Sequence, residues 1–172
     1  MKTDFEDFFP KMLKLELFNK FKIDSSDDKR ILKEVYDALS STEFKTGDII
    51  IKEGDSGDSF YILTDGKVQI FRNTPSGDPI ALANLSSDMN IFFGETALIG
   101  KDTRSATVKA VTDCKTLKIS GKKFLELCEK EPVLGYRVLL CLARRMSDSI
   151  KRVNIDMATL YEALFSEIED HR

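Results

Sequence analysis

The sequence predicts a mainly β domain, a sandwich or a barrel, with helices before it and after it. Short β-rich runs separated by glycines fill the middle of the chain. The segments on both sides instead carry apolar residues at helical spacing. We therefore divide the chain into an N-terminal helical segment (1–41), a β core (42–120) and C-terminal helices (121–172).

The first segment is rich in phenylalanine. Residues 1–23 hold five of the chain's twelve phenylalanines, namely Phe5, Phe8, Phe9, Phe18 and Phe21. Their spacing fits short helical turns broken near Pro10. This face either packs on the rest of the domain or forms a docking surface for a partner. After it, DSSDDKRILKEVYDALSS predicts a helix, because Ser25, Ser26 and Asp27 can cap an apolar stripe.

The middle of the chain carries the strand signals. EFKTGDIIIKEGDSGDSFYILTDGKVQIFRN is a series of β-rich runs punctuated by glycines, and PIALANL, SATVKAV and CKTLKIS are further runs. TPSGDP, between two of the runs, predicts a polar hairpin loop. Strands this short and regularly spaced favour a sandwich or barrel over a parallel α/β sheet.

The last segment predicts two helices. GKKFLELCEKEP forms a short amphipathic helix stopped by Pro132, and no glycine or proline follows Gly135. The apolar residues of the long helix recur alternately four and three apart: Leu139, Ala143, Met146, Ile150, Val153, Met157, Leu160 and Leu164. This heptad spacing is typical of helix pairing, so we expect a homodimer through this helix. A helix lying along its own domain, the alternative, needs a similar stripe.

Composition and charge exclude several classes of protein. The net charge of −3 gives nothing overall that attracts nucleic acid or an anionic membrane. VLLCLA, the longest apolar run, is too short to span a bilayer, and the N-terminus lacks the order of a signal peptide. The three cysteines are widely spaced, so we expect reduced thiols and a cytoplasmic protein.

Catalytic signals are missing as well. The single histidine, His171, is the penultimate residue. A His-based metal triad and a Ser-His-Asp or Cys-His pair all need an ordered histidine. We therefore expect neither an enzyme nor a protein with a metal or cofactor.

The stretch FFGETALIGKDTRSATVKA brings a glycine, an acid and an arginine together. Gly94 allows backbone to approach a ligand closely, and a helical turn from Thr96 to Ile99 would offer unpaired N–H groups to an anion. Arg104 adds a planar donor fork suited to phosphate oxygens. Glu95 would repel a phosphate but can accept a hydrogen bond from a sugar hydroxyl. The residues therefore predict a phosphorylated sugar as ligand.

FGETALIGKDTRSATVKA resembles the phosphate-binding cassette of cyclic-nucleotide-binding domains. Such domains occur in the regulatory subunits of cyclic-AMP-dependent protein kinase and in the bacterial catabolite activator. LELFNKFKIDSSDDKRILKEVYDAL, FKTGDIIIKEGDSGDSFYILTDGKVQIF and FLELCEKEPVLGYRVLLCLARRM are also similar to the family in order and spacing. The resemblance implies an eight-stranded β-roll of the jelly-roll type flanked by helices, with cyclic AMP or cyclic GMP as ligand.

The resemblance also implies roles for single residues. Glu95 should accept a hydrogen bond from the ribose 2′-hydroxyl, with Gly94 packed beside it. The N–H groups of Thr96 and Ala97 should face the cyclic phosphate, and Arg104 should pair with it.

The segment LSSDMNIFFGE departs from the family pattern. The Gly-Asp that usually precedes Phe-Gly-Glu is absent, and the spacing from Leu85 is longer. Asn90 can replace the glycine at a left-handed turn, because Asn tolerates that conformation. This departure concerns ligand affinity more than the fold. The family's turn glycines are matched by Gly54 and Gly66, for which a structural role is expected.

Two serines bear on the identity of the base. Ser105 follows the arginine, where cyclic-GMP-selective relatives have a threonine that bonds guanine. The bacterial activator also has serine there and prefers cyclic AMP. LARRMSDSI resembles the start of the activator's long helix, and Ser149, with Ser147 nearby, lies where a hydroxyl reaches the adenine. The alternative is that Ser147 and Ser149 are ordinary exposed serines of a helix. We therefore favour cyclic AMP over cyclic GMP.

The expected function is that of a sensor without its own output domain. No helix-turn-helix fits after the long helix. We expect the ligand to alter this helix and a separate protein to respond to the change. The alternative is a dimeric scaffold or regulatory subunit with a degenerate pocket that binds no ligand.

Overall fold

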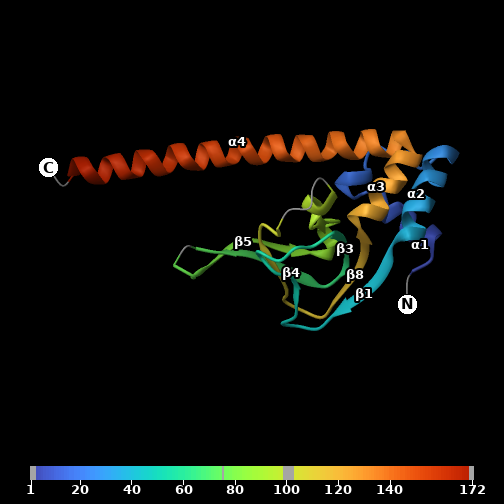
Figure 1. Cartoon of the computed structure of the whole chain (residues 1–172), viewed down its shortest axis with the longest axis horizontal. Coiled ribbons are helices and arrows are strands. Elements are labelled where there is room, and N and C mark those ends of the chain that lie inside the picture. Colours follow the sequence, from blue (N-terminus) through green and yellow to red (C-terminus); the bar gives the residue numbers. More distant parts are fainter. Residues whose placement is uncertain (1–2, 75, 99–102, 171–172) are drawn as a thin grey trace.

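In the computed structural model, which describes residues 3–74, 76–98 and 103–170, eight antiparallel strands form two four-stranded sheets (Figure 1). The strand orders are β1-β8-β3-β6 and β2-β7-β4-β5. The strands are β1 (Ser40–Phe44), β2 (Ile49–Ile51), β3 (Ser59–Asp65), β4 (Lys67–Asn73), β5 (Pro79–Ser86), β6 (Phe92–Phe93), β7 (Thr107–Ala110) and β8 (Cys114–Ser120). The two-sheet β-roll is therefore confirmed.

Strand β3 separates two hydrophobic cores. Its side chains alternate between the two faces of the sheet, as the period of a strand requires. Tyr61 and Leu63 belong to the core enclosed by the two sheets. Phe60 and Ile62 face the helices and join a second, larger core. The helices therefore pack on the outer face of the β1-β8-β3-β6 sheet, and this sheet also carries the turn that follows β6.

The N-terminal helices cover this second core. They are α1 (Phe5–Met12), the 3₁₀ turn η1 (Glu16–Phe18) and α2 (Ser26–Ala38). All five N-terminal phenylalanines are buried, so this face packs on its own domain. Ser25 caps α2 by accepting a hydrogen bond from the N–H of Asp28, as expected. The expected break near Pro10 is wrong, because α1 continues to Met12, where Phe9 and Met12 gain burial.

Two helices follow the β-roll, α3 (Gly121–Lys130) and α4 (Pro132–Asp170). The first turns of α4 pack on the domain through Leu134, Val138 and Leu142. Arg137 anchors the same region, since its guanidinium lies 2.9 Å from the carboxylate of Asp28. Hydrophobic packing and the ion pairs of Arg137 and Arg145 therefore hold the part of the helix up to Arg145.

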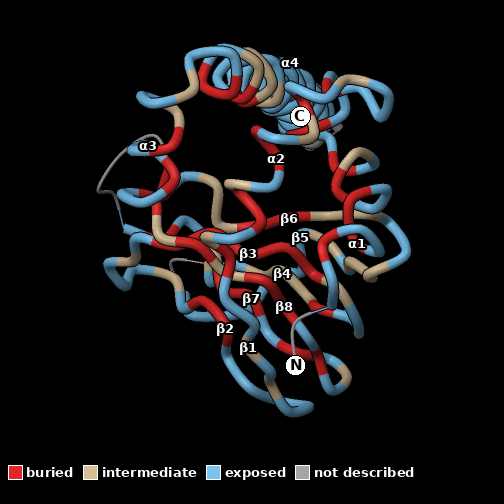
Figure 2. The backbone as a smooth tube through the Cα atoms, turned by 90° about the vertical axis from the view of Figure 1, so that its right-hand side faces the viewer, coloured by how far each residue is buried: buried red, intermediate tan, exposed pale blue. Residues whose placement is uncertain are grey.

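The rest of α4 projects past the β-roll (Figure 1). Beyond Arg145 every residue of this helix with a described burial is exposed. In Figure 2, where α4 is seen nearly end-on, its tube is mostly pale blue. The apolar residues at heptad spacing, here called the seam, are Leu139, Ala143, Met146, Ile150, Val153, Met157, Leu160 and Leu164. All of them are exposed, so the seam does not pack on its own domain. None of the described helices is both long enough and apolar enough to cross a membrane.

Candidate functional site

The loop between β5 and β6 forms a left-handed turn although it lacks the Gly-Asp of the family pattern. Asn90 adopts the left-handed conformation with φ 50° and ψ 58°, which confirms the expectation for this residue. The chain then forms the two-residue strand β6, which pairs with β3. Phe92 and Phe93 are both buried, one on each side of the sheet. This anchoring holds the start of the next turn.

Gly94 makes that turn possible. Its φ of +79° lies in the region that L-residues with a side chain rarely adopt. A Cβ there would also lie 2.9 Å from Cδ1 of Ile51 and 3.1 Å from the carbonyl oxygen of Ser59. Both the backbone conformation and the lack of space therefore require glycine.

The 3₁₀ turn η3 (Glu95–Leu98) follows directly and presents two side chains outward. Ala97 and Leu98 are buried, so Glu95 is left half-buried and Thr96 exposed. The N–H of Ala97 donates to the carbonyl of Gly94 at 3.2 Å, so this turn uses one of the two N–H groups expected to face a phosphate. Ile99, expected at the end of the turn, lies outside the described residues.

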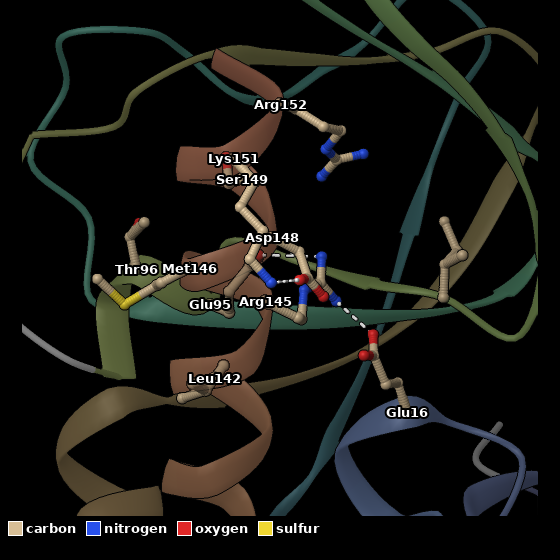
Figure 3. Close-up of a pocket in the computed structure, with 11 residues that line it drawn as sticks. Glu16, Glu95, Thr96, Leu142, Arg145, Met146, Asp148, Ser149, Lys151 and Arg152 are labelled. Atoms are coloured by element: carbon tan, nitrogen blue, oxygen red, sulfur yellow. Dashed lines mark hydrogen bonds and ion pairs between the residues drawn. The ribbon is translucent and has the colours of Figure 1, made fainter. Parts of the chain in front are cut away.

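Glu95 meets a residue that our sequence analysis did not identify. The Nη2 atom of Arg145, on α4, lies 3.2 Å from the Glu95 carboxylate (Figure 3). Arg145 also donates from Nη1 to the Glu16 carboxylate at 3.4 Å. Its guanidinium carbon lies 4.6 Å from the ring centroid of Phe92. One arginine thus joins the N-terminal segment, the β-roll and the long helix.

A groove of about 920 Å³ lies between η3 and α4. Glu95 and Thr96 line it from η3, and Ser149 lines it from α4 (Figure 3). The structure therefore brings three of the predicted site residues together. Lys151 and Arg152 add positive charge to the same groove, so an anionic ligand meets charges of both signs there.

Arg104 is placed differently. It is buried, and its guanidinium donates from Nη1 to the carbonyl of Gly94 at 3.1 Å and from Nη2 to the carbonyl of Ser59 at 2.6 Å. A guanidinium has five N–H donors, so these two bonds leave others for an anion. Arg104 lines a smaller cavity of about 270 Å³, together with Gly57 and Asp58.

Glu95 and Arg104 therefore line two different cavities, although both lie next to Gly94. The carbonyl of Gly94 accepts bonds from both Ala97 and Arg104, so Arg104 is bonded to the turn that carries Glu95. Ser105, the next predicted residue, is exposed and does not line either of these two cavities. The structure thus groups Glu95 with α4, and Arg104 with the loop before β3.

Gly57 is a second residue that our sequence analysis did not assign to the site. A Cβ added there would collide with Nε, Nη2 and Cζ of Arg104. Gly57 has no positive φ, so the backbone conformation does not require glycine. A side chain at residue 57 would therefore disturb the position of the Arg104 guanidinium.

The cysteines and acidic residues near the groove show the following properties. Burial raises the pKa of the Cys141 thiol, on α4 near the groove, and nearby Glu16 raises it further, so this thiol is neutral at pH 7. All three cysteines are free, as expected. Among the described residues, His, Cys, Asp and Glu side chains form no cluster that could hold a metal ion.

Comparisons with known proteins identify the family of the domain. A family model described as the cyclic nucleotide-binding domain matches residues 41–131, more than half of the chain. A cAMP-dependent protein kinase regulatory subunit of Dictyostelium discoideum is 35% identical over 94 residues, which cover 54% of this chain and 28% of that protein. The cyclic AMP receptor protein of Thermus thermophilus is 30% identical over 120 residues, 70% of this chain and 54% of that protein.

A solved structure shows the same fold. The Thermus thermophilus catabolite activator protein superposes with a TM-score of 0.70 at 25% identity, covering 81% of this chain and 62% of that chain. The present chain spans between about a quarter and about half of the two curated relatives described above.

Proposed function

Because the chain belongs to the cyclic nucleotide-binding domain family, we propose that it is a regulatory module that binds cyclic AMP in preference to cyclic GMP. The observation that carries the proposal is that Glu95 lines the groove while Arg104 donates a hydrogen bond to the carbonyl of Gly94, the residue next to Glu95. The names of the two relatives, a cAMP-dependent kinase subunit and a cyclic AMP receptor, support cyclic AMP.

The ligand would use groups on both sides of Gly94. Glu95 would accept from the ribose hydroxyl, and the remaining N–H groups of Arg104 would bind the cyclic phosphate. The base would lie toward α4, where Ser149 offers a hydroxyl. In the described structure the Glu95 carboxylate is paired with Arg145. The ribose must therefore share this carboxylate with Arg145 or replace it.

That competition supplies a route from the ligand to the long helix. Arg145 belongs to α4 and also bonds Glu16, so a change at Glu95 alters how the helix is held. A ligand shifts such an equilibrium only by its difference in affinity for the two arrangements. We propose that a separate protein responds to the resulting change in α4.

We also propose that two copies of the chain pair through the seam. Ile150, Val153 and Leu160 are each more than half exposed, and the part of α4 that carries them projects beyond the domain. Exposed apolar residues at heptad spacing bury their surface against a second helix. Two-fold pairing is the commonest way to do this.

A second candidate function is a dimeric scaffold whose pocket binds no ligand. It is supported by the loop before β6, which departs from the family pattern. It is also supported by the hydrogen bonds that Arg104 already donates to two backbone carbonyls. The two candidates make opposite predictions for ligand binding, so one experiment separates them.

Isothermal titration of nucleotide-free protein with cyclic AMP and cyclic GMP is that experiment. We expect one site per chain and tighter binding of cyclic AMP. Co-purified nucleotide must first be removed and its absence checked by absorbance, since an occupied pocket gives no heat. A folded, empty protein that binds neither nucleotide at millimolar concentration would rule out the sensor and leave the scaffold.

A further inference from the structure

The far end of α4 carries more apolar surface than the seam accounts for. Tyr161, Phe165 and Ile168 are each more than half exposed and follow one another at intervals of four and three residues. This spacing puts them on one face of the helix, with Ala158 one turn before. We call these four residues the distal stripe. It lies beside the seam, since Tyr161 directly follows the seam residue Leu160.

A two-stranded pairing through the seam leaves the distal stripe uncovered. Such a pairing buries the a and d positions, and the side chains on the flank stay in solvent. The preceding part of the helix has a different flank, with the charged or hydroxylated side chains of Arg144, Ser147 and Lys151. The extra apolar face is therefore confined to the end that projects past the β-roll (Figure 1).

The charge of this end is one-sided. The sequence from Val153 to Asp170 contains five acidic residues and neither lysine nor arginine. The sequence from Arg137 to Arg152 contains five basic residues and one acidic residue. Glu162 borders the distal stripe directly, because it lies four residues after Ala158 and three before Phe165.

We propose that the distal stripe is the docking surface for an amphipathic helix of the effector protein, with lysine or arginine beside its apolar face. The apolar residues of such a helix would cover the stripe, and its cations would meet the acidic end of α4. An anionic membrane is disfavoured, because the acidic residues repel it.

A second copy of the chain is disfavoured as the occupant. A copy that lies parallel would bring a further acidic end to the same place, and like charges brought together oppose association, whereas an antiparallel copy is an outcome that the sedimentation test below detects. The inference rests on the proposed function only in taking α4 as the output element. It does not require that the output be switched by a particular nucleotide.

The test uses three fluorescent synthetic helices of about 20 residues, long enough to form helix on binding. The first combines a leucine face with lysine on its flanks. The second carries glutamate in place of every lysine, and the third carries serine in place of every leucine. Fluorescence anisotropy measures their binding to the full chain at low and at physiological salt.

The variant for this test is Tyr161→Ser with Phe165→Ser. Its matched control is Ile80→Ser with Leu82→Ser, which removes two equally exposed apolar side chains from β5. We expect the lysine peptide to bind the parent at least about tenfold more tightly than either other peptide. The stripe variant should lose at least about tenfold in affinity for it, and the β5 variant should bind like the parent.

Three outcomes would overturn the inference. They are equal binding of the three peptides, parent-like peptide binding by the stripe variant, and weaker self-association of the stripe variant in sedimentation. The last outcome would show that a second copy covers the stripe. Nucleotide titration of the stripe variant separates this result from the proposed function, because ligand binding should be unchanged whether or not the peptide binds.

Discussion

The carboxylate of Glu95 and the guanidinium of Arg145 lie 3.2 Å apart, although fifty residues separate them in the chain. The first belongs to the turn after Gly94 and the second to the helix that leaves the domain. The side chains are 27% and 36% exposed respectively, so solvent only partly screens the pair. This contact links η3 to α4 across the groove.

Removing both partners of this link should show coupling between them. We expect Glu95→Gln and Arg145→Ala to be non-additive in the free energy of unfolding by about 0.5 to 1 kcal/mol, which is modest because the pair is partly exposed. Chemical denaturation of the two single variants and the double variant measures this. Arg144→Ala, a change in the neighbouring exposed arginine, should be additive with Glu95→Gln. Additivity in both cases would mean that the Glu95–Arg145 contact has no energetic weight.

Arg104 should dominate the affinity for the cyclic phosphate. We expect Arg104→Ala to weaken binding by about 2 to 4 kcal/mol, because it removes a desolvated charge-assisted contact. Glu95→Ala should weaken binding less, since it removes a bond to a neutral hydroxyl. Isothermal titration measures both.

Arg72→Ala is the control for Arg104, because Arg72 is exposed on β4 and pairs with Glu53. It should leave affinity unchanged. Arg104→Lys, which keeps the charge, should fall between the parent and Arg104→Ala. Parent-like affinity in Arg104→Ala would show that the phosphate binds elsewhere.

Two glycines in one loop should respond in opposite ways to alanine. Gly57→Ala places a Cβ against the Arg104 guanidinium, the far end of a long side chain rather than backbone. It should weaken nucleotide binding with little loss of stability. Gly54→Ala meets open space but has a φ of +83°, so it should lower the free energy of unfolding by about 1 to 2 kcal/mol and spare binding. Thermal unfolding and titration of both variants decide the matter, and a Gly57→Ala variant with full affinity would contradict the prediction.

Charge placed in the seam should abolish pairing. We expect Ile150→Asp with Val153→Asp to convert a dimer into a monomer, because unpaired charges are costly to bury. The measurement is analytical ultracentrifugation at micromolar concentration, with circular dichroism to confirm that the β-roll is intact.

Ile155→Asp is the matched control, since Ile155 is 65% exposed but does not belong to the seam. This variant should remain a dimer. A parent protein that is monomeric with and without nucleotide would end the pairing proposal.

The sequence by itself determined the local features of this protein. The cap at Ser25, the left-handed turn at Asn90 and the heptad period of α4 depend on residues close together in the chain. Each follows from side-chain hydrogen bonding, permitted backbone angles or the repeat of a helix. The prediction at Pro10 failed because burial of neighbouring side chains outweighed a local preference.

Tertiary structure alone decided how the candidate site is held together. Nothing near Glu95 in the sequence indicates Arg145 as its partner, and nothing near Arg104 indicates the carbonyl of Ser59 or the backbone of Gly57. These contacts join segments that meet only when the helices pack on the sheet. The physical reason is that local patterns restrict dihedral angles and periodicity, whereas a contact between distant segments depends on how whole elements pack.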